Sequence, residues 1–187
     1  GKGSVKLLSA GFERQPCIGF GLPSLDAVLN GGLVYGTMIE LFGGEGGGKS
    51  TLALNLLGNA ISSKNNLALI IDAEHKLDPV LSKKLGVDLE TTPLSQPATA
   101  EEAFNIIESA LDNMKTGDCI LVDSIAALTP KDVLEKGIDA HSYGGNSQVM
   151  SRGISIIRDK VAKVGAVVVL INQIREKIGI VYGSPET

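Results

Sequence analysis

The sequence lacks long hydrophobic runs and has only two cysteines among its 187 residues. No apolar stretch approaches the roughly 18 to 20 residues that span a bilayer, and the N-terminal residues lack the apolar centre of a secretory signal. Cys17 and Cys119 are not spaced as metal ligands, and Cys119 heads an apolar run, so we expect reduced thiols rather than a disulfide. These absences predict a soluble, cytoplasmic protein without a membrane segment.

The sequence also has no excess of basic charge, no internal repeat and no low-complexity tract. The formal net charge is −4 and the pI is about 5.2, so no general positive field attracts nucleic acid, and any DNA contact must be local. With 43% apolar residues, the chain is long enough to bury one sizeable core. We therefore expect a single domain over residues 1–187, without a second folded unit.

The most informative motif runs from Gly43 to Ser50, reads Gly-Gly-Glu-Gly-Gly-Gly-Lys-Ser and matches the pattern G-x-x-x-x-G-K-[ST]. An apolar, strand-like run at 37–42 precedes it, and a helix-like segment at 51–64 follows it. Glycines let the backbone aim several amides at phosphate oxygens, Lys49 adds a charge near the β and γ phosphates, and Ser50 offers a hydroxyl to Mg²⁺. A flexible glycine-rich turn is the alternative, but the flanking elements favour a nucleoside triphosphate site.

The remaining elements alternate between strand and helix. Further strands are predicted at 67–71, 119–127 and 166–171, with a short extended piece at 92–96. Helices are predicted at 79–84, with Asp78 as the N-cap, at 98–114 and at 147–164, and a loop is predicted at 137–146. The alternation indicates an α/β fold with a mostly parallel sheet and helices on both faces.

Carboxylates follow two of the predicted strands. Asp123 ends the run Ile-Leu-Val-Asp, the Walker B arrangement in which an aspartate holds Mg²⁺ opposite the phosphate loop. An aspartate that only caps a loop gives the same pattern, but the upstream motif favours the metal site. Because Ser124 rather than a glutamate comes next, the residue that activates water must lie elsewhere. We predict Glu74, at the end of the preceding strand, with Asp72 as second choice; a solvated loop acid or a partner for His75 is the alternative for Glu74.

Two amide side chains, Asn172 and Gln173, end the last predicted strand, and a basic, glycine-containing segment with Arg175 and Lys177 follows them. A neutral amide at this place can hydrogen-bond to a γ phosphate or a water without adding negative charge. A phosphate sensor joined to a basic loop would act as a switch. Polar residues that merely close a strand are the alternative.

Short segments along nearly the whole chain match, in the same order, segments of one protein family. They are residues 1–4 (Gly-Lys-Gly-Ser), 31–33, 43–51, 71–75 (Ile-Asp-Ala-Glu-His), 77–79, 84–88, 95–97, 122–124, 126–130, 171–175 (Ile-Asn-Gln-Ile-Arg) and 183–187 (Gly-Ser-Pro-Glu-Thr). This set resembles the bacterial RecA recombinase family and is far more specific than a phosphate loop alone. The resemblance implies a RecA-like P-loop ATPase core that uses ATP and Mg²⁺, binds single-stranded DNA, exchanges strands in recombination and repair, and assembles into a helical filament.

The resemblance also implies roles for individual residues. The nucleotide would contact Gly43, Gly44, Glu45, Gly46, Gly47, Gly48, Lys49, Ser50, Thr51 and Asp78, the last of them near the adenine. Ser50 and Asp123 would hold Mg²⁺. Lys49, Glu74 and Gln173 would be catalytic, with Glu74 activating water and Gln173 sensing the γ phosphate. DNA would meet the loops at 137–146 and after Gln173, which carry Tyr143, Arg175 and Lys177.

The sequence departs from the family pattern near the nucleotide and at both ends. Two glycines of the segment 45–48 (Glu-Gly-Gly-Gly) stand where the family usually has small hydroxyl residues, which should raise the entropy of the loop rather than abolish phosphate binding. Leu81 replaces a tyrosine that packs on the adenine, so base stacking is weakened or supplied otherwise. Nothing corresponds to the family's N-terminal helix, and the chain stops at Thr187 inside the second DNA loop, so we expect filament formation to need further residues.

The predicted helix at 147–164 departs from the pattern as well. Gln148 and Ser155 stand where the family has arginines that face DNA. The loss of two cations predicts lower affinity for DNA and a flatter salt dependence. Arg152 and Arg158 lie on the same helix and offer a substitute, with ordinary solvent exposure as the alternative.

Two other functions stay open at this point. A nucleotide-gated assembly module would hold ATP with negligible turnover, and tight binding without phosphate release would reveal it. Another RecA-like motor, such as a hexameric helicase or a circadian-clock-type ATPase, is disfavoured by the segments at 71–79 and 172–175. Rings rather than helical filaments in electron micrographs would support that motor.

Overall fold

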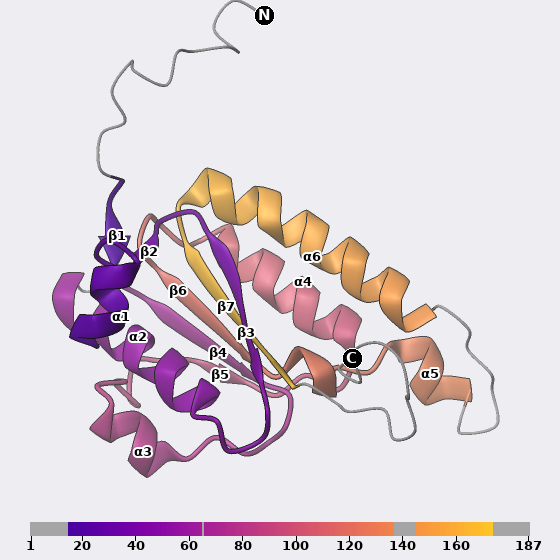
Figure 1. The fold of residues 1–187 in the computed structure, drawn as a ribbon. Helices are drawn as coiled ribbons and strands as arrows, with labels where there is room; N and C mark the ends of the chain where they lie inside the picture. The colour runs from indigo at the N-terminus through magenta and orange to yellow at the C-terminus, as the bar shows by residue number, and fades with distance from the viewer. Residues whose placement is uncertain (1–14, 65, 137–144, 174–187) are drawn as a thin grey trace, which may run out of the picture.

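The computed structural model describes residues 15–64, 66–136 and 145–173 as a layered α/β fold (Figure 1). Its centre is a five-stranded sheet in which every strand pair is parallel. In spatial order the strands are β3 (Met38–Gly43), β7 (Val167–Gln173), β6 (Cys119–Asp123), β4 (Ala68–Asp72) and β5 (Leu94–Ser95). Parallel strands share one direction, so their polar carboxyl ends meet at a single edge of the sheet.

Helices cover both faces of this sheet, as the sequence predicts. Helix α2 (Lys49–Lys64) packs on one face, and α4 (Ala100–Leu111) and α6 (Gly145–Val164) lie along the other, where Figure 1 shows them side by side. Successive residues of one strand alternate between the two cores: Ile70 belongs to the α2 side and Ile71 to the α4 and α6 side. Burial on both faces explains why the central strands are almost continuously apolar.

Shorter elements surround the sheet. They are the antiparallel pair β1 (Cys17–Ile18) and β2 (Leu33–Val34), the helices α1 (Pro23–Val28), α3 (Pro79–Lys84) and α5 (Lys131–Lys136), and the 3₁₀ turn η1 (Ile125–Ala127). The α3 helix has the predicted bounds, and the predicted cap is confirmed because the Asp78 carboxylate accepts hydrogen bonds from the amides of Val80 and Leu81. The sequence did not predict β1, β2, α1 or α5, each of which is only two to six residues long.

The predicted strand at 119–127 is wrong in its second half. Strand β6 ends at Asp123, and η1 follows from Ile125. Asp123 is paired with Asp72, the last residue of the neighbouring β4, so no partner strand on that side continues the ladder. The apolar residues Ile125, Ala126 and Ala127 therefore leave the sheet, although their composition is that of a strand.

Helix α4 is shorter than the predicted 98–114. It begins at Ala100 because the Thr99 hydroxyl accepts a hydrogen bond from the Glu102 amide, which makes Thr99 the N-cap. Its last regular residue is Leu111. Helix α6 begins two residues before the predicted start, at Gly145.

Both cysteines are free thiols, in line with the sequence, and Cys119 is buried in the sheet. Burial raises the pKa of the Cys119 thiol to about 12, and the nearby Asp118 carboxylate acts in the same direction. None of the helices in the described ranges combines the length and the apolar character that a bilayer crossing requires.

Candidate nucleotide-binding site

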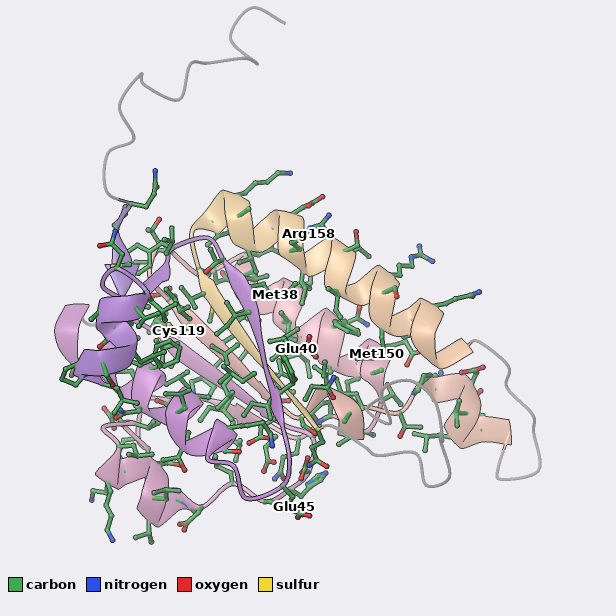
Figure 2. The ribbon with its side chains drawn as sticks, viewed as in Figure 1. Met38, Glu40, Glu45, Cys119, Met150 and Arg158 are labelled. Carbon is green, nitrogen blue, oxygen red and sulfur yellow. The ribbon has the colours of Figure 1, made fainter. Side chains whose placement is uncertain are left out.

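The phosphate loop connects the end of β3 to the start of α2, which is the strand, loop and helix order that the motif predicts. Figure 2 shows Glu45 on this loop, at the end of the sheet where the strands terminate. Gly46 and Gly48 have φ angles of +73° and +80°, a region that residues with a Cβ rarely adopt. Glycine at these two positions therefore shapes the loop through backbone conformation; an added Cβ would meet no atom within 4 Å at either one.

Lys49 is the first residue of α2, and its side chain folds back over the loop. Its Nζ donates hydrogen bonds to the carbonyl oxygens of Gly43 at 3.0 Å and Gly44 at 2.8 Å. The ammonium group thus lies beside the loop and near the amino end of a 16-residue helix, whose free amides and dipole also attract anions.

Ser50 and Asp123 bring the loop and the end of β6 together. The Ser50 hydroxyl donates a 2.6 Å hydrogen bond to Oδ2 of Asp123. Burial raises the pKa of the Asp123 carboxyl, although the hydrogen bond from Ser50 opposes that change. The described residues contain no cluster of three or more His, Cys, Asp or Glu side chains that would enclose a metal ion. One hydroxyl and one carboxylate fit Mg²⁺, which keeps several waters and takes its other ligands from phosphates.

Glu74 lies just beyond the end of β4 and accepts hydrogen bonds from three side chains. Its Oε1 accepts from the Ser124 hydroxyl and from Nε2 of Gln173, each at 2.6 Å, and its Oε2 accepts from Nζ of Lys76 at 3.2 Å. The hydrogen bond from Ser124 is the main cause that lowers the pKa of Glu74, and Lys76 adds to it against the effect of burial. Glu74 and Gln173, which sequence reasoning selected separately, are therefore in direct contact.

Asp72, the second choice for the water-activating residue, has a different environment. It is 2% exposed, and its oxygens accept hydrogen bonds from the amides of Lys76 and Leu77 and from Nε2 of Gln96. These donors occupy the carboxylate and fix the turn that follows β4. The geometry thus favours Glu74 over Asp72 as the residue that meets a water molecule.

A cavity of about 210 Å³ joins most of the predicted nucleotide-site residues. Its polar lining residues are Glu45, Lys49, Ser50, Asp72, Glu74, Lys76, Asp78, Asp123 and Gln173. Its remaining lining residues are Gly46, Leu54, Leu77, Leu81 and Ile171. The apolar side chains on the α2 and α3 side suit the flat face of a base, and the polar ones at the sheet edge suit phosphates.

Other predicted residues of the site lie beside this cavity. Gly43 and Gly44 bind the Lys49 ammonium through their carbonyls, and Gly47 and Gly48 line an adjacent cavity of about 290 Å³. Thr51 is exposed on the first turn of α2.

The predicted DNA contacts lie mostly outside the part of the chain that the structure describes. Tyr143, Arg175 and Lys177 belong to the ranges 137–144 and 174–187, which are not described. Arg152 is exposed on α6, as are Gln148 and Ser155, the two positions where the family pattern has arginines.

Sequence reasoning missed three residues that organise the site. Ser124 and Lys76 bind the Glu74 carboxylate, and Gln96 binds Asp72 across the sheet. In the sequence, Ser124 directly follows Asp123, the predicted metal ligand, and Lys76 lies two residues after Glu74, the predicted catalytic residue. This closeness is the only signal for either residue in the sequence. Gln96 has no such signal, because its contact depends on the pairing of β5 with β4.

Comparison with known proteins gives a consistent result. The sequence model of the RecA N-terminal domain family matches residues 1–187. The chain is 43% identical over 189 residues to Protein RecA of Rhodopirellula baltica, and 41% identical over 188 residues to Protein RecA of Prochlorococcus marinus strain NATL1A. Both alignments cover 100% of this chain, but only 50% and 49% of the two relatives. The chain therefore spans about half the length of the curated relatives it matches.

Proposed function

The chain belongs to the RecA family, and on that basis we propose that it is the ATP-binding core of a DNA-dependent ATPase that acts in homologous recombination and DNA repair. The observation that supports this most directly is the meeting of Lys49, Ser50, Asp123, Glu74 and Gln173 around one cavity. These residues come from four separate segments of the sequence, so their meeting is not a consequence of the phosphate-loop motif alone.

In the proposed reaction the chain acts by positioning and by electrostatics. The loop amides and Lys49 hold the β and γ phosphates, and Ser50 and Asp123 hold Mg²⁺, which neutralises charge on the phosphates. Glu74 accepts a hydrogen bond from a water molecule and orients it for in-line attack on the terminal phosphate. Apolar side chains such as Leu81 contact the base.

Gln173 connects this chemistry to DNA in the proposal. Its side-chain amide donates to Glu74, and it is the last residue of β7, immediately before the basic segment that carries Arg175 and Lys177. We propose that single-stranded DNA binds that segment and changes the position of Gln173, and with it the position of Glu74. Self-association into a filament is part of the same proposal and involves the whole protein.

ATP turnover by the whole protein tests this proposal. Phosphate release is measured with and without single-stranded DNA over a series of salt concentrations, for the natural sequence, for Lys49→Met and for the control Lys84→Met, an exposed residue at the end of α3. We expect turnover that DNA stimulates, that salt suppresses and that Lys49→Met abolishes while Lys84→Met does not. Tight nucleotide binding without phosphate release in every condition would instead support an assembly module.

A further inference from the structure

Lys76 is a lysine of the nucleotide cavity that neither the phosphate-loop motif nor the carboxylate pattern identifies. It lines the cavity described above and also a neighbouring open cavity of about 440 Å³, formed with Glu45, Glu74, Ser124, Ala126 and Gln173 among others. In the described part of the chain, Lys49 and Lys76 are the only basic residues that line either cavity. Five carboxylates line the first cavity, so an anionic ligand there depends strongly on these two cations.

The two lysines have different partners within the site. Lys49 contacts the carbonyls of the phosphate loop, whereas Nζ of Lys76 is 3.2 Å from Oε2 of Glu74. The proposed function, on which this inference rests, requires Glu74 to hold the water that attacks the terminal phosphate. A group within hydrogen-bonding distance of Glu74 is therefore within reach of that phosphate as well.

The backbone that carries Lys76 is fixed by buried groups. The buried Asp72 carboxylate accepts hydrogen bonds from the amides of Lys76 and Leu77, and His75 has a φ angle of +55°, a left-handed conformation that turns the chain sharply. The side chain of Lys76 thus starts from a defined point at the mouth of the cavity. Its own exposed fraction is 71%, so the ammonium group is free to change partners.

The ion pair between Lys76 and Glu74 is suited to exchange. An exposed lysine contributes little stability through such a pair, and a phosphate oxygen with a full charge competes well for the ammonium group. Glu74 stays anchored without Lys76, because its Oε1 accepts hydrogen bonds from Ser124 and Gln173. Departure of Lys76 leaves Oε2 free to accept a hydrogen bond from water.

We propose that Lys76 is a nucleotide-binding residue that transfers its ammonium group from Oε2 of Glu74 to the terminal phosphate of a bound nucleoside triphosphate. The transfer does two things at once. It adds a cation that only a triphosphate reaches, so the pocket distinguishes ATP from ADP, and it opens Oε2 of Glu74 to the attacking water. No bond is made or broken, and the ammonium group keeps its charge throughout.

Binding of a non-hydrolysable ATP analogue and of ADP, both with Mg²⁺, tests the proposal by calorimetry at one salt concentration. In Lys76→Met we expect the affinity for the analogue to fall roughly tenfold, which corresponds to the loss of one charge-assisted hydrogen bond. The affinity for ADP should change less than about twofold, because ADP lacks the terminal phosphate. Lys76→Arg should restore much of the discrimination. Lys83→Met, an exposed lysine on α3 that lines neither cavity, should bind both nucleotides as the natural sequence does.

A second pair of variants separates contact with phosphate from an effect through Glu74. In the Glu74→Gln background, Lys76 no longer has a charged partner, so any effect of Lys76 on binding cannot act through that ion pair. Lys76→Met should still lower the affinity for the analogue in this background and leave the affinity for ADP nearly unchanged. The proposal would be overturned if Lys76→Met had no effect on analogue binding in the Glu74→Gln background. It would also be overturned if Lys76→Met lowered the affinities for the analogue and for ADP equally, or lowered neither. Each of these results would leave the ATP-binding function standing. Failure of the natural sequence to bind either nucleotide would overturn both.

Discussion

The hydroxyl of Ser50 and the carboxylate of Asp123 are 2.6 Å apart, although 73 residues separate them in the sequence. Ser50 lies in the first turn of α2, and Asp123 is the last residue of β6. The contact depends on the sheet order, in which β7 lies between β6 and β3, the strand that leads into the phosphate loop. This hydrogen bond therefore joins the phosphate loop to the end of β6, and it brings together the two side chains that we propose as ligands of Mg²⁺.

Glu74→Gln tests the residue that orients water. The glutamine keeps an oxygen that can accept from Ser124, so we expect nucleotide binding to persist while turnover falls about 10²- to 10⁴-fold, the usual contribution of a general base. Phosphate release and analogue binding are measured on the same preparation. Glu90→Gln, an exposed acid outside the cavity, is the matched control. Unchanged turnover in Glu74→Gln would refute the assignment.

Asp72→Ala tests a structural role for the neighbouring carboxylate. The amides of Lys76 and Leu77 and the side chain of Gln96 would lose their acceptor beneath the turn, so we expect the free energy of unfolding to fall by about 2–4 kcal/mol. Urea denaturation measures this. Asp88→Ala also removes an acceptor from a backbone amide, but at a fully exposed site, and should change stability little. Equal effects of the two substitutions would contradict the account.

The close packing of α4 on α6 depends on Gly153. A methyl group at this position would overlap the ring of Phe104, so Gly153→Ala should destabilise the fold by about 1–3 kcal/mol, although alanine normally favours a helix. Thermal unfolding measures the change, and Ser155→Ala, on an exposed position of the same helix, serves as the control. Adding Phe104→Leu should recover part of the loss. A neutral or stabilising Gly153→Ala would show that the helices are less closely packed.

The buried thiol of Cys119 predicts a dependence of stability on alkaline pH. Its pKa in the folded protein is raised to about 12, so above its ordinary pKa near 9 the unfolded chain loses the proton while the folded chain keeps it. Stability should therefore fall as pH rises from about 9 to 12, by up to roughly 1.4 kcal/mol per pH unit.

Denaturation at a series of pH values measures this slope, and Cys119→Ala should flatten it. Alkylation of the native protein gives an independent check. The partly exposed Cys17 should react with iodoacetamide at neutral pH, whereas Cys119 should react only after unfolding. Similar rates for both thiols would contradict the burial of Cys119.

The sequence predicts those parts of the site that depend on local signals. The phosphate loop follows from glycine spacing, the α3 cap from Asp78 before a proline, and the position of Asp123 from an apolar run that ends in an acid. Parallel pairing then explains why Asp123 and Glu74 come close, because adjacent parallel strands end at the same edge.

Contacts that depend on tertiary structure were not predictable in the same way. The end of β6 is set by the length of its neighbour β4, which composition does not reveal, so the predicted strand extended too far. The hydrogen bonds from Lys76 and Ser124 to Glu74 require the sharp turn at His75 and the chain path after Asp123. A single domain over the whole chain, and the DNA contacts at Tyr143, Arg175 and Lys177, stay predictions.

The most direct test of the central claim is a crystal structure of the protein with Mg²⁺ and a non-hydrolysable ATP analogue. We predict density for the triphosphate along the loop from Gly43 to Ser50, with Lys49 at the β and γ phosphates and the metal ion between Ser50 and Asp123. Nucleotide bound elsewhere at saturating concentration, or Lys49 and Asp123 turned away from the phosphates, would contradict the claim.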